Sequence, residues 1–174
     1  SLKHQQNYYA SESYFYLTDL GNAKTIGKVA EINEPAGQQV FSFPNFSFYE
    51  KELQNLISSG SQWFGEQFKP GGSHSVNLSL DDADLSKPAR FSVYVAGKSS
   101  SASSMNVSLN GKPVKDISFQ TVDVGDPTVY FADDRIVEFT ETLPSKNLQV
   151  KLTYTASNSS SDAWLDYVAV NYQS

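Results

Sequence analysis

The side chains of this chain that could do chemistry are two histidines and a set of carboxylates, because the sequence contains no cysteine. His74 follows a Gly-Gly loop, and His4 lies near the N-terminal end. Histidine is a suitable general base, but a hydrolytic triad needs a residue that orients it, and a zinc site needs about four ligands. Neither histidine has a second histidine or a cysteine close in sequence. A loop position without a catalytic role is therefore the favoured interpretation of His74.

Three aspartates, Asp81, Asp82 and Asp84, cluster after a predicted strand. Calcium binds several oxygens at about 2.4 Å, so this group is a candidate for a structural calcium site. The cluster lacks the spaced glycine and the final glutamate of an EF-hand loop, and aspartates that hydrogen-bond the backbone of their own turn explain it equally well. No other cofactor is indicated. A glycosidase would need two carboxylates about 5–9 Å apart, and no such pair stands out in the sequence.

The segment Trp63-Phe64-Gly65-Glu66 is the densest candidate motif, and three interpretations of it compete. The aromatic pair could cover one end of the fold while Glu66 caps an amide or pairs with a base. The pair could instead contact a neighbouring domain, or Glu66 could be a general acid. Gly65 indicates a close approach of the backbone or a positive φ. Asp166 lies within an apolar strand and must find hydrogen-bond donors, because a bare buried carboxylate is costly.

Aromatic residues on predicted strands offer a further candidate site. Exposed rings on one face of a sheet could stack against a sugar, and Tyr94 and Tyr154 are the candidates for such a role. Aromatic side chains also supply large buried areas, so packing in the core is the alternative interpretation.

The composition excludes several classes of function. The formal net charge is −6, and nucleic-acid binding needs clustered lysine and arginine. No stretch approaches the roughly 20 apolar residues of a membrane span. Without cysteine, disulfides and thiolate catalysis are also excluded. The high aromatic content and the scarcity of long Leu/Ala/Glu/Lys runs favour strands over helices.

Alternating apolar and polar residues predict most of the elements. Strands are predicted at residues 76–80, 91–95, 105–109, 114–119, 128–131, 135–140, 148–154 and 163–171. Asn110-Gly111 predicts a two-residue hairpin turn, since both positions accept a positive φ. The last strand is apolar on both faces. Strict alternation places Trp164, Val168 and Val170 on one side and Leu165, Tyr167 and Ala169 on the other.

These elements predict a mainly β fold, an antiparallel β-sandwich of the jelly-roll type, although the spacing alone fits an immunoglobulin-like sandwich as well. Apolar residues at helical spacing predict a short helix over 49–57 that Gly60 ends. Two aromatic or apolar runs, at 13–18 and 25–32, predict an N-terminal hairpin. We therefore expect two regions: a hairpin and connection at 1–46, for which the end of an upstream unit is one interpretation, and the sandwich at 47–174.

Three stretches resemble the sortases of the type IX secretion system of Bacteroidetes, which are PorU-type, gingipain-like cysteine peptidases of family C25. The first stretch matches at Tyr49, Glu50, Leu53, Asn55, Leu56, Ser59, Gly60, Trp63, Phe64, Gly65 and Glu66. The second, Trp164-Leu-Asp-Tyr-Val-Ala-Val-Asn171, is similar to a strand that precedes the catalytic domain in that family, and with residues 91–97 and 105–111 it looks like a galactose-binding-type jelly roll. The third covers residues 7–18.

The resemblance implies a fragment of a larger enzyme at the cell surface, on the extracellular side of the outer membrane. The family's catalytic cysteine and histidine have no counterpart here, so no catalytic residue is carried over, and the fragment itself is expected not to be an enzyme. Its role would be that of an accessory domain, with the downstream peptidase domain of the same chain as its partner, and with secreted cargo or outer-membrane secretion components as further candidates. A carbohydrate-binding module is the alternative.

Overall fold

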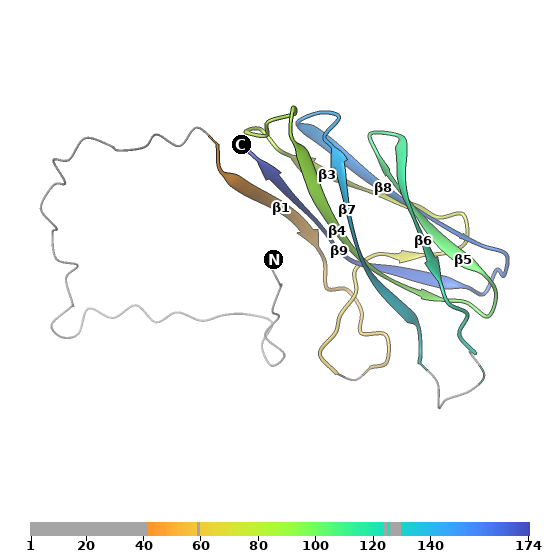
Figure 1. Cartoon of the computed structure of the whole chain (residues 1–174). Helices are drawn as coiled ribbons and strands as arrows, with labels where there is room; N and C mark the ends of the chain where they lie inside the picture. The colour runs from red at the N-terminus through yellow and green to blue at the C-terminus, as the bar shows by residue number, and fades with distance from the viewer. Residues whose placement is uncertain (1–41, 59, 124, 126–129) are drawn as a thin grey trace, which may run out of the picture. The chain divides into compact units, whose positions relative to one another are not determined.

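The computed structural model of the chain describes residues 42–174 except 59, 124 and 126–129. These residues belong to one compact unit and form nine strands and no helix (Figure 1). The strands are β1 (Pro44–Glu50), β2 (Gln67–Phe68), β3 (Ser73–Ser79), β4 (Pro88–Lys98), β5 (Ser103–Leu109), β6 (Lys112–Phe119), β7 (Asp133–Thr142), β8 (Asn147–Ala156) and β9 (Asp162–Gln173). In this part of the chain there is accordingly no helix long and apolar enough to cross a membrane.

The strands form two antiparallel sheets. The first has the order β1-β9-β4-β7, with β2 also paired to β9, and the second has the order β3-β8-β5-β6. With β2 set aside, the eight remaining strands follow the order 1-8-3-6 in one sheet and 2-7-4-5 in the other. This is the strand order of a jelly roll, in which two Greek keys share a core. The prediction of a mainly β antiparallel sandwich of this type is confirmed.

The core lies between the two sheets and follows the predicted alternation. On β4 the buried residues are Phe91, Val93 and Val95, and on β8 they are Leu148, Val150, Leu152 and Tyr154. The residues between them on both strands are less buried or exposed. Because successive side chains of a strand point to opposite faces, this pattern seals one face of each sheet against the other.

The hairpin between β5 and β6 has the predicted turn. Asn110 and Gly111 adopt φ values of 46° and 86°, and the two strands pair across them. Two positive φ values are what a two-residue turn of this type requires. The Asn110 side chain also links the turn to β8, where its Oδ1 accepts from the Gln149 amide at 2.6 Å.

A β-bulge interrupts β9. On β4, Tyr94 pairs with Tyr167 and the next residue, Val95, pairs with Leu165, so Asp166 is an extra residue between two consecutive pairs. A bulge of this kind bends the strand and changes its facing.

The bulge corrects the predicted facing of β9. Leu165 is fully buried in the core together with Val168 and Val170, whereas Trp164 packs in a separate small cluster. Strict alternation would have placed Trp164 with Val168. The extra residue at Asp166 shifts the period by one and exchanges the two faces for the residues before it.

The predicted helix over 49–57 is wrong. Tyr49 is part of β1, and the residues after Glu50 form an irregular loop. The helical spacing is misleading because the apolar residues do not share a face: Tyr49 packs against the core, but Leu53 and Ile57 are 60% and 61% exposed. The predicted hairpin at 13–18 and 25–32 and the boundary at residue 46/47 stay predictions, since the first lies outside the described residues. Of the predicted strand at 128–131, residues 130 and 131 are not in a strand, and the others lie outside the described residues.

Candidate functional site

The Trp-Phe-Gly-Glu motif lies in the loop of residues 51–66, which connects β1 to β2 (Figure 1). Both flanking strands pair with β9, so the loop leaves and rejoins the same strand. It rejoins at the bulge, where the Gly65 amide donates to the Leu165 carbonyl at 2.7 Å and the Leu165 amide donates to the Glu66 carbonyl at 3.0 Å. The motif and the bulge therefore form one structural unit.

The 51–66 loop is closed by its own backbone. The Leu53 amide donates to the Phe64 carbonyl, and the Phe64 amide donates to the Gln54 carbonyl, both at 2.9 Å. Near the tip, the Asn55 side-chain amide donates to the Gly60 carbonyl at 3.2 Å. Loops that bond internally in this way hold their shape without a regular element.

Gly65 is needed where the loop meets β9. A Cβ atom at this position would lie 2.9 Å from the Lys51 carbonyl oxygen and 3.2 Å from the Leu165 carbonyl oxygen. Both neighbours are backbone atoms and cannot swing away. Of the two predicted reasons for this glycine, the structure shows the close approach, while its φ is not among the positive ones.

The two aromatic residues of the motif have different environments. Phe64 is 4% exposed and packs with Ala96 and Trp164 on the outer side of the five-stranded sheet. Its ring centroid is 5.8 Å from that of Tyr94. Trp63, in contrast, is 41% exposed. The loop is thus anchored by one ring and presents the other to its surroundings.

Glu66 is the centre of a polar cluster that joins the two sheets. Its Oε1 accepts a hydrogen bond from the Tyr49 hydroxyl of β1 and lies 3.0 Å from the Lys51 Nζ. His74 of β3 places Nε2 at 3.5 Å from the same oxygen and at 3.3 Å from the Tyr49 hydroxyl. Since β1 and β3 belong to different sheets, the carboxylate links the edges of both.

This cluster keeps Glu66 ionised. Burial opposes its charge, but the hydrogen bonds from Tyr49 and Lys51 outweigh that effect and hold the pKa of the carboxyl below its ordinary value of 4.5. Burial, together with the bond to Glu66, raises the pKa of Tyr49 above 10.0. A general acid that works near neutral pH needs a raised carboxyl pKa. The third interpretation of the motif, Glu66 as an acid catalyst, therefore finds no support in this geometry.

In the structure His74 lies beside Tyr49 and Glu66, which the residues next to it in the sequence do not indicate. It lies in β3 rather than in a loop, and its ring is 6.1 Å from that of Tyr49. Glu66 is in a position to orient it. An orienting carboxylate and an imidazole make two members of a hydrolytic triad, but no serine hydroxyl is bonded to His74 among the described residues, where its polar contacts are with Tyr49 and Glu66.

Tyr94 is less available to a ligand than a surface tyrosine would be. Its ring packs against Phe64 and Tyr167, with ring centroids 5.8 and 5.7 Å away. Its hydroxyl accepts from Gln62 of the 51–66 loop and donates to Asp134 at 3.0 Å. Burial raises the pKa of Tyr94 to about 12.

The other two candidates on strands are buried. Tyr154 has no exposed surface and lies in the core against Phe119, so in this structure its ring cannot stack on a sugar. Asp166 is 7% exposed at the bulge, and its charge contributes to the raised pKa of Tyr94. Both residues thus have structural surroundings.

The three aspartates predicted to hold calcium do not converge. Asp82 accepts from the Tyr172 hydroxyl at 2.9 Å and from the Ser174 hydroxyl at 2.8 Å, and these bonds lower its pKa. Asp81 and Asp84 each bond a serine two residues away within their own turns. Among the described residues there is no group of three His, Cys, Asp or Glu side chains that could hold a metal ion. The residues present therefore do not fit a calcium site.

Sequence comparison matches the chain to no family model and to no curated protein. Comparison of structures does find similar folds. A crystal structure of dimeric latent PorU from Porphyromonas gingivalis superposes with a TM-score of 0.65 at 20% identity, over 80% of this chain and 13% of that one. This chain shares its fold with one part of PorU. It spans only about 13% of that protein's length.

Two carbohydrate-binding modules also superpose, with lower scores. One is a CBM36 module in complex with calcium and xylotriose, at a TM-score of 0.43 and 13% identity over 74% of this chain and 98% of that chain. The other is a family 35 module from Clostridium thermocellum, at a TM-score of 0.40 and 16% identity over 74% of this chain and 90% of that chain.

Proposed function

We propose that this chain is a non-catalytic accessory domain of a larger cell-surface peptidase of the PorU type, and that it positions a neighbouring domain of the same polypeptide. The fold it shares with a small part of PorU supports this proposal, because most of that protein lies outside the match. The motif that resembles type IX sortases, Trp63-Phe64-Gly65-Glu66, is consistent with the same proposal. An extracellular, cell-surface location and contacts with secreted cargo belong to the same proposal.

The observation that carries the proposal is the arrangement of the 51–66 loop. Phe64 and Glu66 fix the loop to the sandwich, while Trp63, Leu53 and Ile57 remain 41%, 60% and 61% exposed. Exposed apolar side chains on a well-anchored loop are typical of a contact surface. The second interpretation of the motif, an interdomain contact, fits this arrangement best.

The test compares Trp63→Ser in two contexts. In the 174-residue chain alone, the substitution of an exposed side chain should change stability by no more than about 0.5 kcal/mol. In the full-length parent polypeptide it should increase cleavage between domains under limited proteolysis, because the contact is lost. Leu85→Ser is the matched control, since Leu85 is 38% exposed and lies outside the loop. Equal proteolysis of both variants and the wild type would contradict the interdomain role.

A carbohydrate-binding module is the alternative function. The two tyrosines predicted to stack on a sugar do not support it, because Tyr154 is buried and the ring of Tyr94 is packed between two others. Affinity electrophoresis in gels that contain soluble polysaccharides separates the two functions. Retardation of the wild-type chain by any of these polymers would favour the module over the accessory domain.

A further inference from the structure

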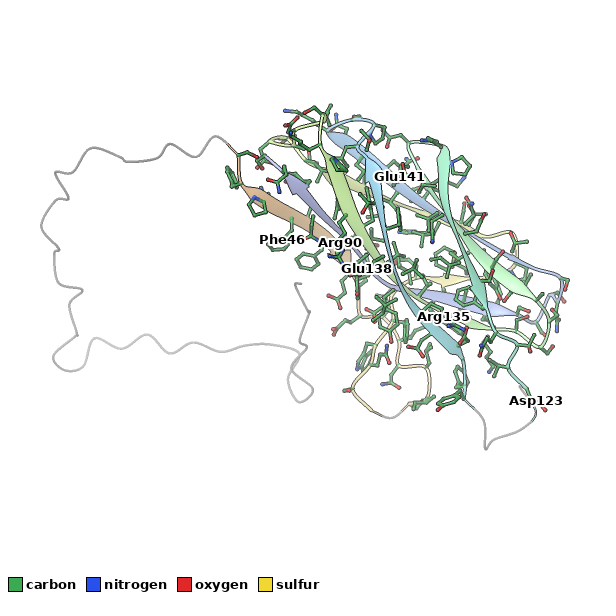
Figure 2. The ribbon with its side chains drawn as sticks, viewed as in Figure 1. Phe46, Arg90, Asp123, Arg135, Glu138 and Glu141 are labelled. Carbon is green, nitrogen blue, oxygen red and sulfur yellow. The ribbon has the colours of Figure 1, made fainter. Side chains whose placement is uncertain are left out.

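The C-terminal end of the described chain runs past one of its neighbouring strands. Strand β4 pairs with β9 only as far as Asn171, which lies opposite Arg90. Strand β1 continues on the other side, with Phe46 opposite Asn171. Figure 2 shows Phe46 and Arg90, the two residues that flank this point. Among the described residues, Tyr172 and Gln173 therefore have a strand partner only on the β1 side.

The loop of residues 80–87, which connects β3 to β4, takes the place of β4 beside the end of β9 (Figure 1). The Asp84 amide donates to the Gln173 carbonyl at 2.8 Å. The Asp82 carboxylate accepts from the Tyr172 hydroxyl at 2.9 Å and from the Ser174 hydroxyl at 2.8 Å. The backbone and a side chain of one loop thus hold the end of β9.

Asp82 also holds the start of β1. Its Oδ2 accepts from the Asn45 side-chain amide at 2.6 Å as well as from Ser174. Next to this contact the Phe43 amide donates to the Ser174 carbonyl at 3.3 Å, and the Ser174 amide donates to the Phe43 carbonyl at 3.0 Å. We call Asp82 with Asn45, Tyr172 and Ser174 the Asp82 clamp. Hydrogen bonds to a charged acceptor are stronger than those to a neutral one, so the clamp is well suited to hold the chain end.

The loop that carries Asp82 is itself fixed. Leu80 and Ala83, on either side of it, are 0% and 4% exposed in the core. The Leu80 amide donates to the Lys146 carbonyl at 2.8 Å, and the Lys146 Nζ donates to the Asp81 carbonyl at 2.7 Å. Buried side chains and bonded backbone groups place a segment among the stable parts of a fold. Asp82 is therefore attached to a well-fixed part of the molecule.

We propose that Asp82 is a positioning residue, which keeps residues 172–174 in line with β9 so that a segment following Ser174 leaves the domain in one direction. The ends of a domain are otherwise poorly ordered unless contacts tie them down. The inference rests on the proposed function, in which this domain positions a neighbouring one of the same polypeptide. A fixed junction transmits the orientation of the sandwich to that domain, whereas a flexible junction permits the relative motion that is the default between domains.

Backbone order in the 174-residue chain tests the clamp. In Asp82→Ala the order parameters of the Gln173 and Ser174 amides, measured by nitrogen relaxation, should fall from about 0.85, typical of rigid backbone, to below about 0.6. The Val168 amide within β9 should stay rigid in both proteins, because its side chain is fully buried in the core. It reports whether the substitution has disturbed the sandwich itself.

Asp81→Ala is the matched control. It removes the same charge from the adjacent residue, whose carboxylate accepts from the Ser79 hydroxyl at 2.9 Å. Its order parameters at the chain end should equal those of the wild type. Ser174→Ala is a second test that leaves the loop untouched. It removes one donor of the clamp and should lower the order parameters of the same amides, but by less than Asp82→Ala does.

Small-angle X-ray scattering of the full-length parent polypeptide tests the positioning role. Asp82→Ala should increase the radius of gyration, because the neighbouring domain then samples more orientations, and Asp81→Ala should not. Both variants are also measured in the Trp63→Ser background, since under the proposed function an intact contact with the 51–66 loop holds the neighbouring domain by itself. In that background the increase caused by Asp82→Ala should be larger.

The outcomes separate the clamp from the proposed function. Order parameters that are equal in the wild type and in Asp82→Ala would overturn the clamp, whatever the neighbouring domain does. A flexible chain end in Asp82→Ala, with unchanged scattering of the parent in both backgrounds, would overturn the positioning role. The proposed interdomain contact stands or falls separately, with the proteolysis of Trp63→Ser.

Discussion

Glu66 connects side chains of the two sheets outside the core. Its carboxylate binds Tyr49 from one sheet and lies near His74 from the other, with Lys51 at 3.0 Å. Hydrogen bonds to a charged group contribute more to stability than bonds between neutral groups. Removing the charged group also leaves its buried partners without a hydrogen-bond acceptor, which is costly. Glu66 thus links the two sheets at the edges that β1 and β3 form.

We expect Glu66→Gln to lower the free energy of unfolding by about 1–3 kcal/mol at neutral pH, because the remaining donors lose a charged acceptor. Urea unfolding followed by tryptophan fluorescence measures this change. Glu138→Gln is the control, since its bond to Arg90 is exposed and worth less than about 1 kcal/mol.

The pH dependence of stability tests the same contribution of Glu66. The folded pKa lies below 4.5, so ionisation stabilises the protein above that pH and the contribution is lost in stronger acid.

The difference between wild type and Glu66→Gln should therefore narrow as the pH falls below 4.5. A variant as stable as the wild type at neutral pH would show that the cluster contributes nothing to folding.

At the scale of the element, the 51–66 loop and β9 depend on each other. The loop enters the sheet through bonds between Gly65 or Glu66 and Leu165, next to the bulge at Asp166. The loop contains no regular strand or helix, and β9 has a bulge where the loop joins it. Phe64 of the loop packs against Trp164 of β9, which is 4% exposed.

Gly65→Ala tests this dependence. The added methyl group would lie 2.9 Å from a backbone carbonyl oxygen, so we expect a loss of about 1–3 kcal/mol in stability and a red shift in the emission of Trp164. Gly125→Ala is the control, since among the described residues a Cβ there would meet the Asp123 side chain at 3.4 Å, an ordinary contact. If both variants melt at the wild-type temperature, the contact between loop and strand is not tight.

Strands whose core-facing residues alternate with polar ones, including the partly buried β7, could be predicted from the sequence, whereas β1 could not. In β3, β4, β5 and β8 the core imposes strict alternation, which periodicity detects. In β1 the inward positions are Asn45, Ser47 and Tyr49, and the apolar residues Phe46 and Phe48 face outward, so the pattern does not mark the face that packs on the core. The prediction of which β9 residues face the core failed for another reason. The run of apolar residues gives no sign that Asp166 is an extra residue in the strand.

Only those residues of the candidate site that lie in the Trp-Phe-Gly-Glu motif could be predicted from the sequence. The motif indicated that Gly65 and Glu66 matter, and both have defined structural surroundings. Its partners Tyr49 and His74 come from strands of different sheets. Their proximity depends on how the sheets stack, and no pattern local to one segment carries that information.

At the scale of the whole molecule, residues from both sheets share a single core. Leu152 of the four-stranded sheet and Leu165 of the five-stranded sheet are both fully buried in it. A common core favours one cooperative unfolding transition for the described domain.

We expect Leu152→Ala and Leu165→Ala each to cost about 2–5 kcal/mol and to move the same transition, because each leaves a cavity in the shared core. Far-ultraviolet circular dichroism and tryptophan fluorescence should give coincident midpoints for both variants. Leu53→Ala, at a position that is 60% exposed, should change little. Separate midpoints for the two sheets would show that they fold independently.

The extra residue at Asp166 also determines which changes of length this domain can accept. Deleting Asp166 would restore a regular ladder with β4 and would leave Leu165 beside Val95 in the core, because Tyr94–Tyr167 and Val95–Leu165 are already consecutive pairs. A deletion elsewhere in β9 would instead exchange the two faces for the residues on one side of it, so related chains should vary in length at position 166 before they vary at any other position of this strand.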